Sequence, residues 1–110
     1  QASERKRQRL EEQKTELKKA RDKNSHELCE QMVKESPAIL EEAMETFFKE
    51  KPEFKQFSLP GKTPMQNYRE RAVFWMFVDP YLIQHSPERF QAVQDSYETS
   101  LAALEQEMAA

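Results

Sequence analysis

The eleven aromatic residues of this 110-residue chain all lie between Phe47 and Tyr97. The same stretch holds the single tryptophan and the longest apolar run, Ala72 to Val78. Aromatic side chains bury more area per residue than other side chains, so the hydrophobic core must form around them. A core of this size fits one domain, residues 1–110, whose aromatic-rich part spans 36–90.

The composition excludes a sheet-rich fold. Apolar residues make up 37% of the chain and charged residues 34%, and there is one glycine. Typical globular domains are about 45–50% apolar and about 25% charged. A chain this polar must have a high ratio of surface to core, as an elongated helical protein has. An all-β fold and a phosphate-binding loop both require several glycines. We therefore expect an all-α fold.

Proline marks the expected helix starts. A capping residue precedes proline at Ser36-Pro37, Thr63-Pro64, Asp79-Pro80 and Ser86-Pro87. Proline suits the first helical position because its missing N–H would have no partner there. Gln66 lies three residues after Thr63, which completes a capping box. These signals predict helical starts at residues 37, 64, 80 and 87, of which the start at 80 opens only a short turn. The second helix is expected to end near Val78, with a turn over 80–85 before the third.

Residues 1–35 predict a long, charged and basic helix. Asn24 to Glu27 offers a second cap, so we expect a break there that leaves residues 1–23 frayed. Residues 87–108 predict an amphipathic C-terminal helix. The expected architecture is a small helical bundle over about 37–90, from which the N- and C-terminal helices project as a coiled-coil-like arm.

The sparse apolar residues of the two terminal helices are the candidate assembly interface. They recur at spacings of three, four and seven residues, which favours helix pairing. The candidates are Leu10, Leu17, Leu28, Tyr97, Leu101, Leu104 and Met108. These residues can pair antiparallel within one chain or between two chains, and the sequence leaves both arrangements open.

Charge is distributed unevenly along the chain. Residues 1–25 carry a balance of +4, whereas residues 26–110 carry −7, and the total is −3. A basic segment can contact nucleic acid phosphates or an acidic protein, including a second copy. The candidate contacts are Arg5, Lys6, Arg7, Arg9, Lys14, Lys18, Lys19, Arg21 and Lys23. Acidic residues interrupt this segment, and many of its charges are expected to pair along the helix.

The sequence supplies little for catalysis or metal binding. His26 and Cys29 lie on neighbouring helical turns, but a zinc site needs more ligands and His85 is the other histidine. A Cys–His nucleophile also lacks an evident third group. We expect a buried cysteine beside an exposed histidine. Arg69 and Arg71 could stack on bases, but we favour a core helix that carries them to solvent. No enzyme activity, metal, cofactor or small-molecule substrate is expected.

The sequence thus favours a non-enzymatic protein-interaction module that self-associates and docks on a macromolecular partner. The alternative is a nucleic-acid-associated accessory protein whose basic helix contacts phosphates. A third alternative is a structural spacer within a longer chain. No stretch approaches the ~18 apolar residues of a membrane span, so we expect no membrane partner. The expected location is the cytoplasm, or the nucleus in a eukaryote. Because the chain begins at Gln1, a removed leader remains an alternative.

Overall fold

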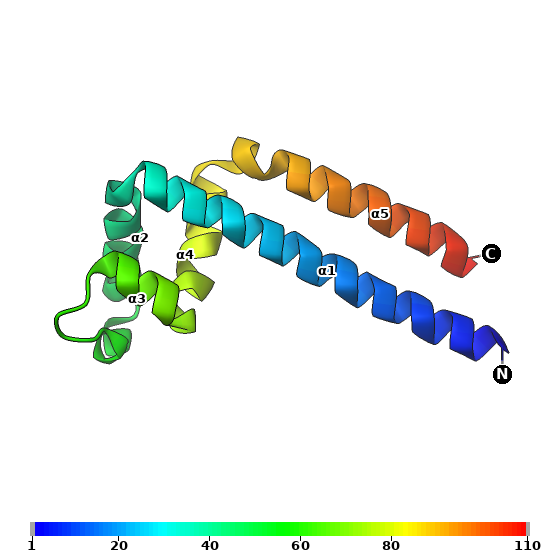
Figure 1. Ribbon diagram of the computed structural model, residues 1–110, viewed down its shortest axis with the longest axis horizontal. Coiled ribbons are helices and arrows are strands. Elements are labelled where there is room, and N and C mark those ends of the chain that lie inside the picture. Colours follow the sequence, from blue (N-terminus) through cyan, green and yellow to red (C-terminus); the bar gives the residue numbers. More distant parts are fainter. Residues whose placement is uncertain (1, 110) are drawn as a thin grey trace.

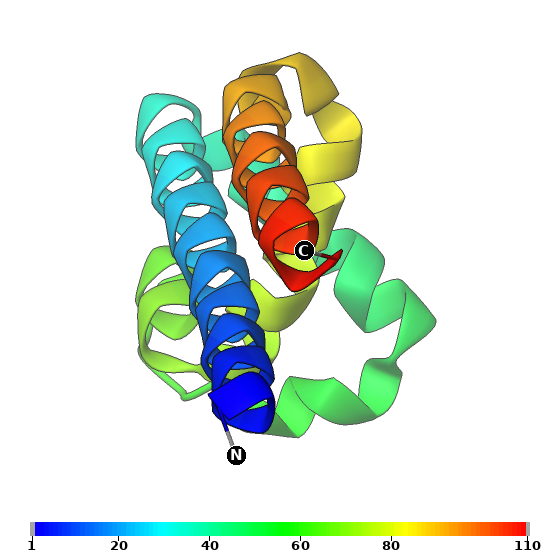
Figure 2. The same cartoon turned by 90° about the vertical axis from the view of Figure 1, so that its right-hand side faces the viewer.

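Two long helices form a projecting arm. The computed structural model describes residues 2–109, which fold into helices and their connections. Helix α1 (Ala2–Glu35) and helix α5 (Gln91–Ala109) lie side by side and run antiparallel, so that both chain ends are at one tip (Figures 1 and 2). We call this pair the arm. It gives the molecule an extended shape with axes of 56, 29 and 21 Å.

The remaining elements form a bundle at the other end of α1. They are helix α2 (Pro37–Glu50), the 3₁₀ helix η1 (Pro52–Phe57), helix α3 (Pro64–Glu70), helix α4 (Ala72–His85) and the 3₁₀ helix η2 (Pro87–Phe90). The bundle hangs from one end of the arm, so the whole molecule resembles an L (Figure 1). The predicted all-α fold with long terminal helices is confirmed.

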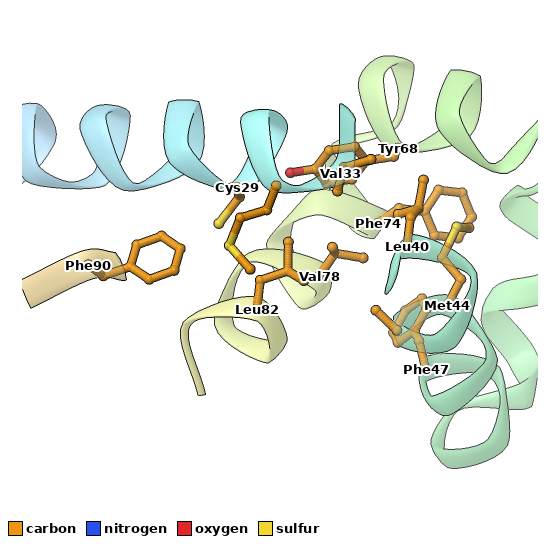
Figure 3. Close-up of a cluster of buried hydrophobic side chains, with 12 residues drawn as sticks. Cys29, Val33, Leu40, Met44, Phe47, Tyr68, Phe74, Val78, Leu82 and Phe90 are labelled. Carbon is orange, nitrogen blue, oxygen red and sulfur yellow. The ribbon is translucent and has the colours of Figure 1, made fainter. Parts of the chain in front are cut away.

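The hydrophobic core lies where α1 crosses the bundle. Figure 3 shows Cys29 and Val33 of α1 facing Val78 and Leu82 of α4, with Phe90 of η2 pointing toward them. These side chains are at most 5% exposed. A second part of the core is aromatic. There the ring of Phe47 lies 4.5 Å from Phe77, 5.3 Å from Phe54 and 6.0 Å from Phe74, measured between centroids.

Three of the four predicted proline starts are correct. Pro37, Pro64 and Pro87 each open a helical element. The capping box at Thr63 is also confirmed: its hydroxyl accepts from the Gln66 backbone N–H at 3.2 Å. The Gln66 side chain in turn accepts from the Thr63 N–H at 2.9 Å. At Ser36 and Ser86 the serine side chain makes no capping hydrogen bond.

The fourth proline was interpreted wrongly. Pro80 lies inside α4, and residues 80–85 form its second half rather than a turn. The flanking residues Val78 and Leu82 are fully buried. Their burial outweighs the local cost of a proline within a helix, which removes one backbone hydrogen bond. Asp79 consequently does not cap a helix, and its side chain is used elsewhere.

Two predicted boundaries also differ from the structure. Helix α1 continues through Asn24 to Glu27 without a break, because α4 and α5 pack along it and supply tertiary contacts. The helix expected from Pro64 to Val78 is interrupted at Arg71, whose backbone is extended (φ −119°, ψ 110°). This break lets α3 and α4 turn independently onto the core.

The connection between η1 and α3 contains the one glycine, Gly61, at a φ of +79°. Positive φ is strained for side-chain-bearing residues, so this turn explains the glycine. Phe54 and Leu59 are half-buried, as expected of side chains that fold back onto the core. The sequence also predicts that Phe57 of this connector folds back onto the core, but Phe57 is 41% exposed, so that prediction is wrong. Across residues 2–109, no helix combines the length and apolarity that a membrane crossing requires.

Truncating the buried aromatic residue Phe74 tests this core. We expect Phe74→Ala to lower the free energy of unfolding by ~3–5 kcal/mol, because the side chain is fully buried and a cavity would remain. Phe57→Ala, at a ring that is 41% exposed, should cost less than ~1 kcal/mol. Urea denaturation followed by circular dichroism measures both. Equal losses would contradict this assignment of the core.

Candidate functional site

Helix α4 has one buried face and one exposed face. Phe74, Val78 and Leu82 are spaced four residues apart and are each fully buried against α1 and α2. Ala72, Met76 and Pro80 follow the same spacing on the opposite side and are exposed. We call this second side, together with the half-buried Val73 and Ile83 beside it, the outer face of α4.

The outer face of α4 is unusual because it is apolar. Between Ala72 and His85 the sequence contains one charged residue, Asp79. Surface helices of globular proteins normally turn charged residues to solvent, and helices that are apolar all round are normally buried. Met76 is nevertheless 65% exposed. The outer face of α4 therefore has the composition of a buried surface.

A cavity of about 580 Å³ adjoins this face, in the angle between α1, α4 and the start of α5. We call it the elbow groove. Its apolar lining comes from Trp75, Met76, Pro80, Ile83, Pro87 and Phe90. Its polar lining comes from Arg21, Asp22, Ser25, His26, Asp79, Gln91 and Gln94. A concave, mostly apolar surface with a few polar groups is typical of binding sites.

Asp79 forms the polar wall of the elbow groove. Its Oδ1 accepts a hydrogen bond from the Tyr68 hydroxyl at 2.7 Å. Its Oδ2 lies 2.5 Å from Nδ1 of His26, whose Nε2 is 3.3 Å from Oε1 of Glu30. The carboxylate thus joins α1, α3 and α4. Charge-assisted hydrogen bonds of this kind are stronger than neutral ones, so Asp79 fixes the angle between the arm and the bundle.

Burial and the Asp79 carboxylate keep two neighbouring groups protonated. Burial raises the pKa of the Tyr68 hydroxyl far above its usual value, and its hydrogen bond to Asp79 adds to the shift. Burial likewise raises the pKa of the Cys29 thiol, and the charge of Asp79 contributes. Reactive cysteines instead have a lowered pKa and solvent access. The environment of Cys29 is that of a structural thiol.

His26 and Cys29 lie close to the same carboxylate but do not form a Cys–His pair. The thiol donates to the backbone carbonyl of Asp79 at 3.8 Å, whereas His26 contacts the side chains of Asp79 and Glu30. His26 is half-buried rather than exposed as expected. Among residues 2–109, no three His, Cys, Asp or Glu side chains are grouped so as to hold a metal ion.

The seven candidate assembly residues all lie in the arm. Leu10 is 2% exposed and the other six are half-buried: Leu17, Leu28, Tyr97, Leu101, Leu104 and Met108. Leu17 and Leu104 meet at one place where α1 packs on α5 of the same chain, and Leu10 and Met108 meet at another. Arg21 is also part of this contact, with its guanidinium 4.4 Å from the centre of the Tyr97 ring. The antiparallel arrangement within one chain is therefore the one that the structure adopts.

The nine candidate phosphate contacts do not form one surface. Lys14 and Arg21 are half-buried beside α5, and Lys6 and Arg7 line a small hollow with Leu10 and Met108. The other five, Arg5, Arg9, Lys18, Lys19 and Lys23, are exposed. Within residues 2–109, the arm's lysines and arginines form ion pairs at Lys19–Glu16, 3.6 Å, and Arg21–Asp22, 3.1 Å.

Sequence reasoning missed the most distinctive residues of this site. Asp79 was interpreted as a helix cap, and Met76 as one more core residue of an apolar run. The signal was present, because a helix of 14 residues with one charged residue has no polar face to turn outward. Arg69 is exposed and Arg71 is half-buried. The prediction that both arginines lie on the solvent side of the helix is therefore largely correct.

Comparisons of the chain with protein-family models, curated proteins and solved structures gave no match.

Alkaline pH should destabilise this protein through Tyr68 and Cys29. Both groups have a higher pKa in the folded chain than in the unfolded chain, where values of about 10 and about 8.5 are usual. Their contribution to stability is thus complete below about pH 8.5 and decreases as the pH rises, by up to ~1.4 kcal/mol per pH unit for each group.

This loss can be measured by urea denaturation at pH 8 to 11, with Tyr68→Phe as the variant that removes the phenol. We expect a shallower decrease for Tyr68→Phe than for the original chain. In the folded chain, Tyr68 should also give no phenolate absorbance at 295 nm until the protein unfolds. Phenolate formation by all three tyrosines in the folded chain would contradict the burial of Tyr68.

Proposed function

We propose that this chain is a self-associating protein-interaction module that pairs with a second copy through the outer face of α4. The observation that carries the proposal is the exposure of Met76 on a helical face without charged residues. The centres of homodimer interfaces are apolar and depleted in charge, and methionine is enriched in interfaces. Burying this face against another copy would remove it from water, which is favourable.

Charges at the two ends of α4 support pairing with a second copy. Arg69 and Arg71 lie at its N-terminal end, and Asp79, whose carboxylate oxygens are already bonded to Tyr68 and His26, lies in its second half. Asp22 of α1 lines the elbow groove beside that second half. In a two-fold dimer with antiparallel α4 helices, the arginine end of each copy meets the aspartate end of the other. Such an interface uses the same surface on both copies.

The proposed interface differs from the one expected from the sequence. Helix α5 packs along α1 of the same chain, and its Leu104 lines a hollow together with Leu17 of α1. Substituting them would disturb the arm rather than remove an unpaired surface. Met76 and Pro80 lack such an intrachain partner over much of their surface, since both remain exposed. The outer face of α4 is therefore the better candidate for self-association.

Light scattering after size exclusion tests the proposal across a range of concentrations. We expect the mass of a dimer for the original chain and the mass of a monomer for Met76→Asp, because the variant places a charge at the centre of the interface. The matched control is Gln106→Asp, which adds the same charge at an exposed position on α5. It should remain dimeric. Unchanged circular dichroism verifies that both variants fold.

A charge exchange tests the antiparallel pairing. Arg71→Glu alone and Asp22→Arg alone should each weaken the dimer roughly tenfold or less, as rim charges usually do. The double variant should recover part of the affinity. A chain that is monomeric at all concentrations would rule out self-association. A dimer that Met76→Asp leaves intact would instead place the interface elsewhere.

The second candidate function is contact with nucleic acid, favoured by one observation. Arg5 and Arg9 are exposed one helical turn apart near the tip of the arm, on the side of α1 away from Arg7. Because the basic residues are dispersed around α1, we expect weak, non-specific binding at most.

Fluorescence anisotropy with a labelled oligonucleotide at increasing salt tests this candidate. Binding through phosphates should weaken steeply as salt rises, and the Arg5→Gln/Arg9→Gln variant should make that dependence shallower. Dimerisation through α4 should be nearly insensitive to salt by comparison. Absence of any anisotropy change at low salt would remove nucleic acid from consideration.

A further inference from the structure

Besides the small hollow beside Leu10 and Met108, the arm carries two larger hollows that the proposed dimer does not use. The first, near the tip, has a volume of about 510 Å³ and lies between the two helices. Its lining residues from α1 are Gln13, Glu16 and Leu17. Those from α5 are Ser100, Ala103, Leu104 and Glu107. We call it the tip socket.

The second hollow, nearer the bundle, also has a volume of about 510 Å³. Its lining residues from α1 are Asn24, Glu27, Leu28 and Gln31. Those from α5 and η2 are Arg89, Ala92, Val93 and Ser96. We call it the inner socket.

The two sockets are related by a shift of 11 residues along both helices. On α1, the amide, glutamate and leucine of the tip socket recur 11 positions later as Asn24, Glu27 and Leu28. On α5, which runs the other way, Ala103 and Leu104 recur 11 positions earlier as Ala92 and Val93. Eleven residues are close to three helical turns, about 16.5 Å. The sockets therefore lie on the same side of the arm with similar chemistry.

Each socket combines an apolar floor with an acidic edge. The floor residues Leu17, Leu28, Val93 and Leu104 are only half-buried. Ala92 and Ala103 have small side chains at the α5 edge of the sockets, so another helix could approach α5 closely. Glu16 and Glu27 stand exposed on the α1 edge, one beside each socket. Helix α5 contains no lysine or arginine that could neutralise these edges, and its Glu107 adds a further carboxylate to the tip socket. Glu16 lies 3.6 Å from Lys19 of α1, but both side chains are exposed and such surface pairs are weak. Arg89 of η2, beside the inner socket, is paired with Glu35 at 3.0 Å.

We propose that this side of the arm binds a basic amphipathic helix of a partner protein, which inserts one bulky apolar side chain into each socket. The two side chains would lie 11 residues apart on the partner, and lysine or arginine residues beside them would face Glu16 and Glu27. Helix-in-groove recognition commonly uses such spaced apolar anchors. Charge complementarity selects a basic helix over an acidic one.

The energetic reason is that the arm is an incomplete bundle. No residue of α5 between Gln91 and Ala109 is fully buried, although its apolar residues lie at helix-packing spacing. A third helix would cover Leu17, Leu28, Val93 and Leu104 and remove further apolar area from water, at ~25 cal/mol per Å². This proposal does not depend on the dimer, which uses the outer face of α4.

The probe is a synthetic lysine-rich helical peptide of about 18 residues, ~27 Å long, with two phenylalanines 11 residues apart. The control peptide has the same composition with its phenylalanines nine residues apart, which places them on opposite helical faces. Titration calorimetry with the full chain measures both. We expect the probe to bind about tenfold or more tightly than the control.

Two variants of adjacent alanines show where the probe binds. Ala103→Leu fills the tip socket and should weaken probe binding about tenfold. Ala102→Leu makes the same change at an exposed position outside the sockets and should leave binding unchanged. Equal binding of the two peptides, or an unaffected Ala103→Leu variant, would overturn the proposal. Circular dichroism and light scattering check that both variants keep their fold and oligomeric state.

Discussion

The burial of one face of α4 is the constraint on which the rest of the structure depends. Phe74, Val78 and Leu82 are fully buried between α1 and α2, so α4 cannot rotate about its axis without exposing them. Because the helix is apolar on all sides, fixing this face turns Met76 and Pro80 outward. The exposed apolar surface is thus a geometric consequence of how the core is built. It persists because neither α1 nor α2 reaches round to cover it.

Asp79 converts this packing into a defined angle between the arm and the bundle. A carboxylate that is largely removed from water needs partners, and it finds them in Tyr68 of α3 and His26 of α1. Removing one partner of such a group lowers the free energy of unfolding by more than the net contribution of the hydrogen bond, because the remaining groups stay buried without a partner. The network therefore holds three helices together at the wall of the elbow groove. Burial raises the pKa of the nearby Cys29 thiol, and the charge of Asp79 adds to this effect, so the thiol stays neutral.

The arm and α4 offer surfaces of different chemistry. The outer face of α4 is apolar and uncharged, which suits a like surface on a second copy. The side of the arm with the two sockets is acidic and hollowed, which suits a basic helix. A dimer joined through α4 would leave the sockets of both copies accessible, so the two proposals are compatible. Both surfaces have the same origin. The helices of one chain are too long and too few to cover all of their own apolar side chains, so some of these side chains stay exposed or half-buried.

The sequence by itself determined the helical class, the aromatic location of the core and three helix starts. Local chemistry is sufficient for these features: a single glycine excludes sheets with tight turns, and proline after a capping residue opens a helix at Pro37, Pro64 and Pro87. Periodicity also identified the apolar residues that join α1 to α5. The pairing within one chain was decided only by the tertiary structure, because the same seam satisfies either one chain or two.

Tertiary structure alone also decided the features at the candidate site. A proline at position 80 predicts a helix start locally, but the burial of Val78 and Leu82 carries the helix through it. Asp79 then meets His26, 53 residues away in the sequence, and no local pattern reports such a contact. The outward side of α4 could not be deduced either, since an apolar run without periodicity does not reveal which of its faces will be covered. Local preferences fixed the elements, whereas long-range packing determined which of their surfaces remained exposed.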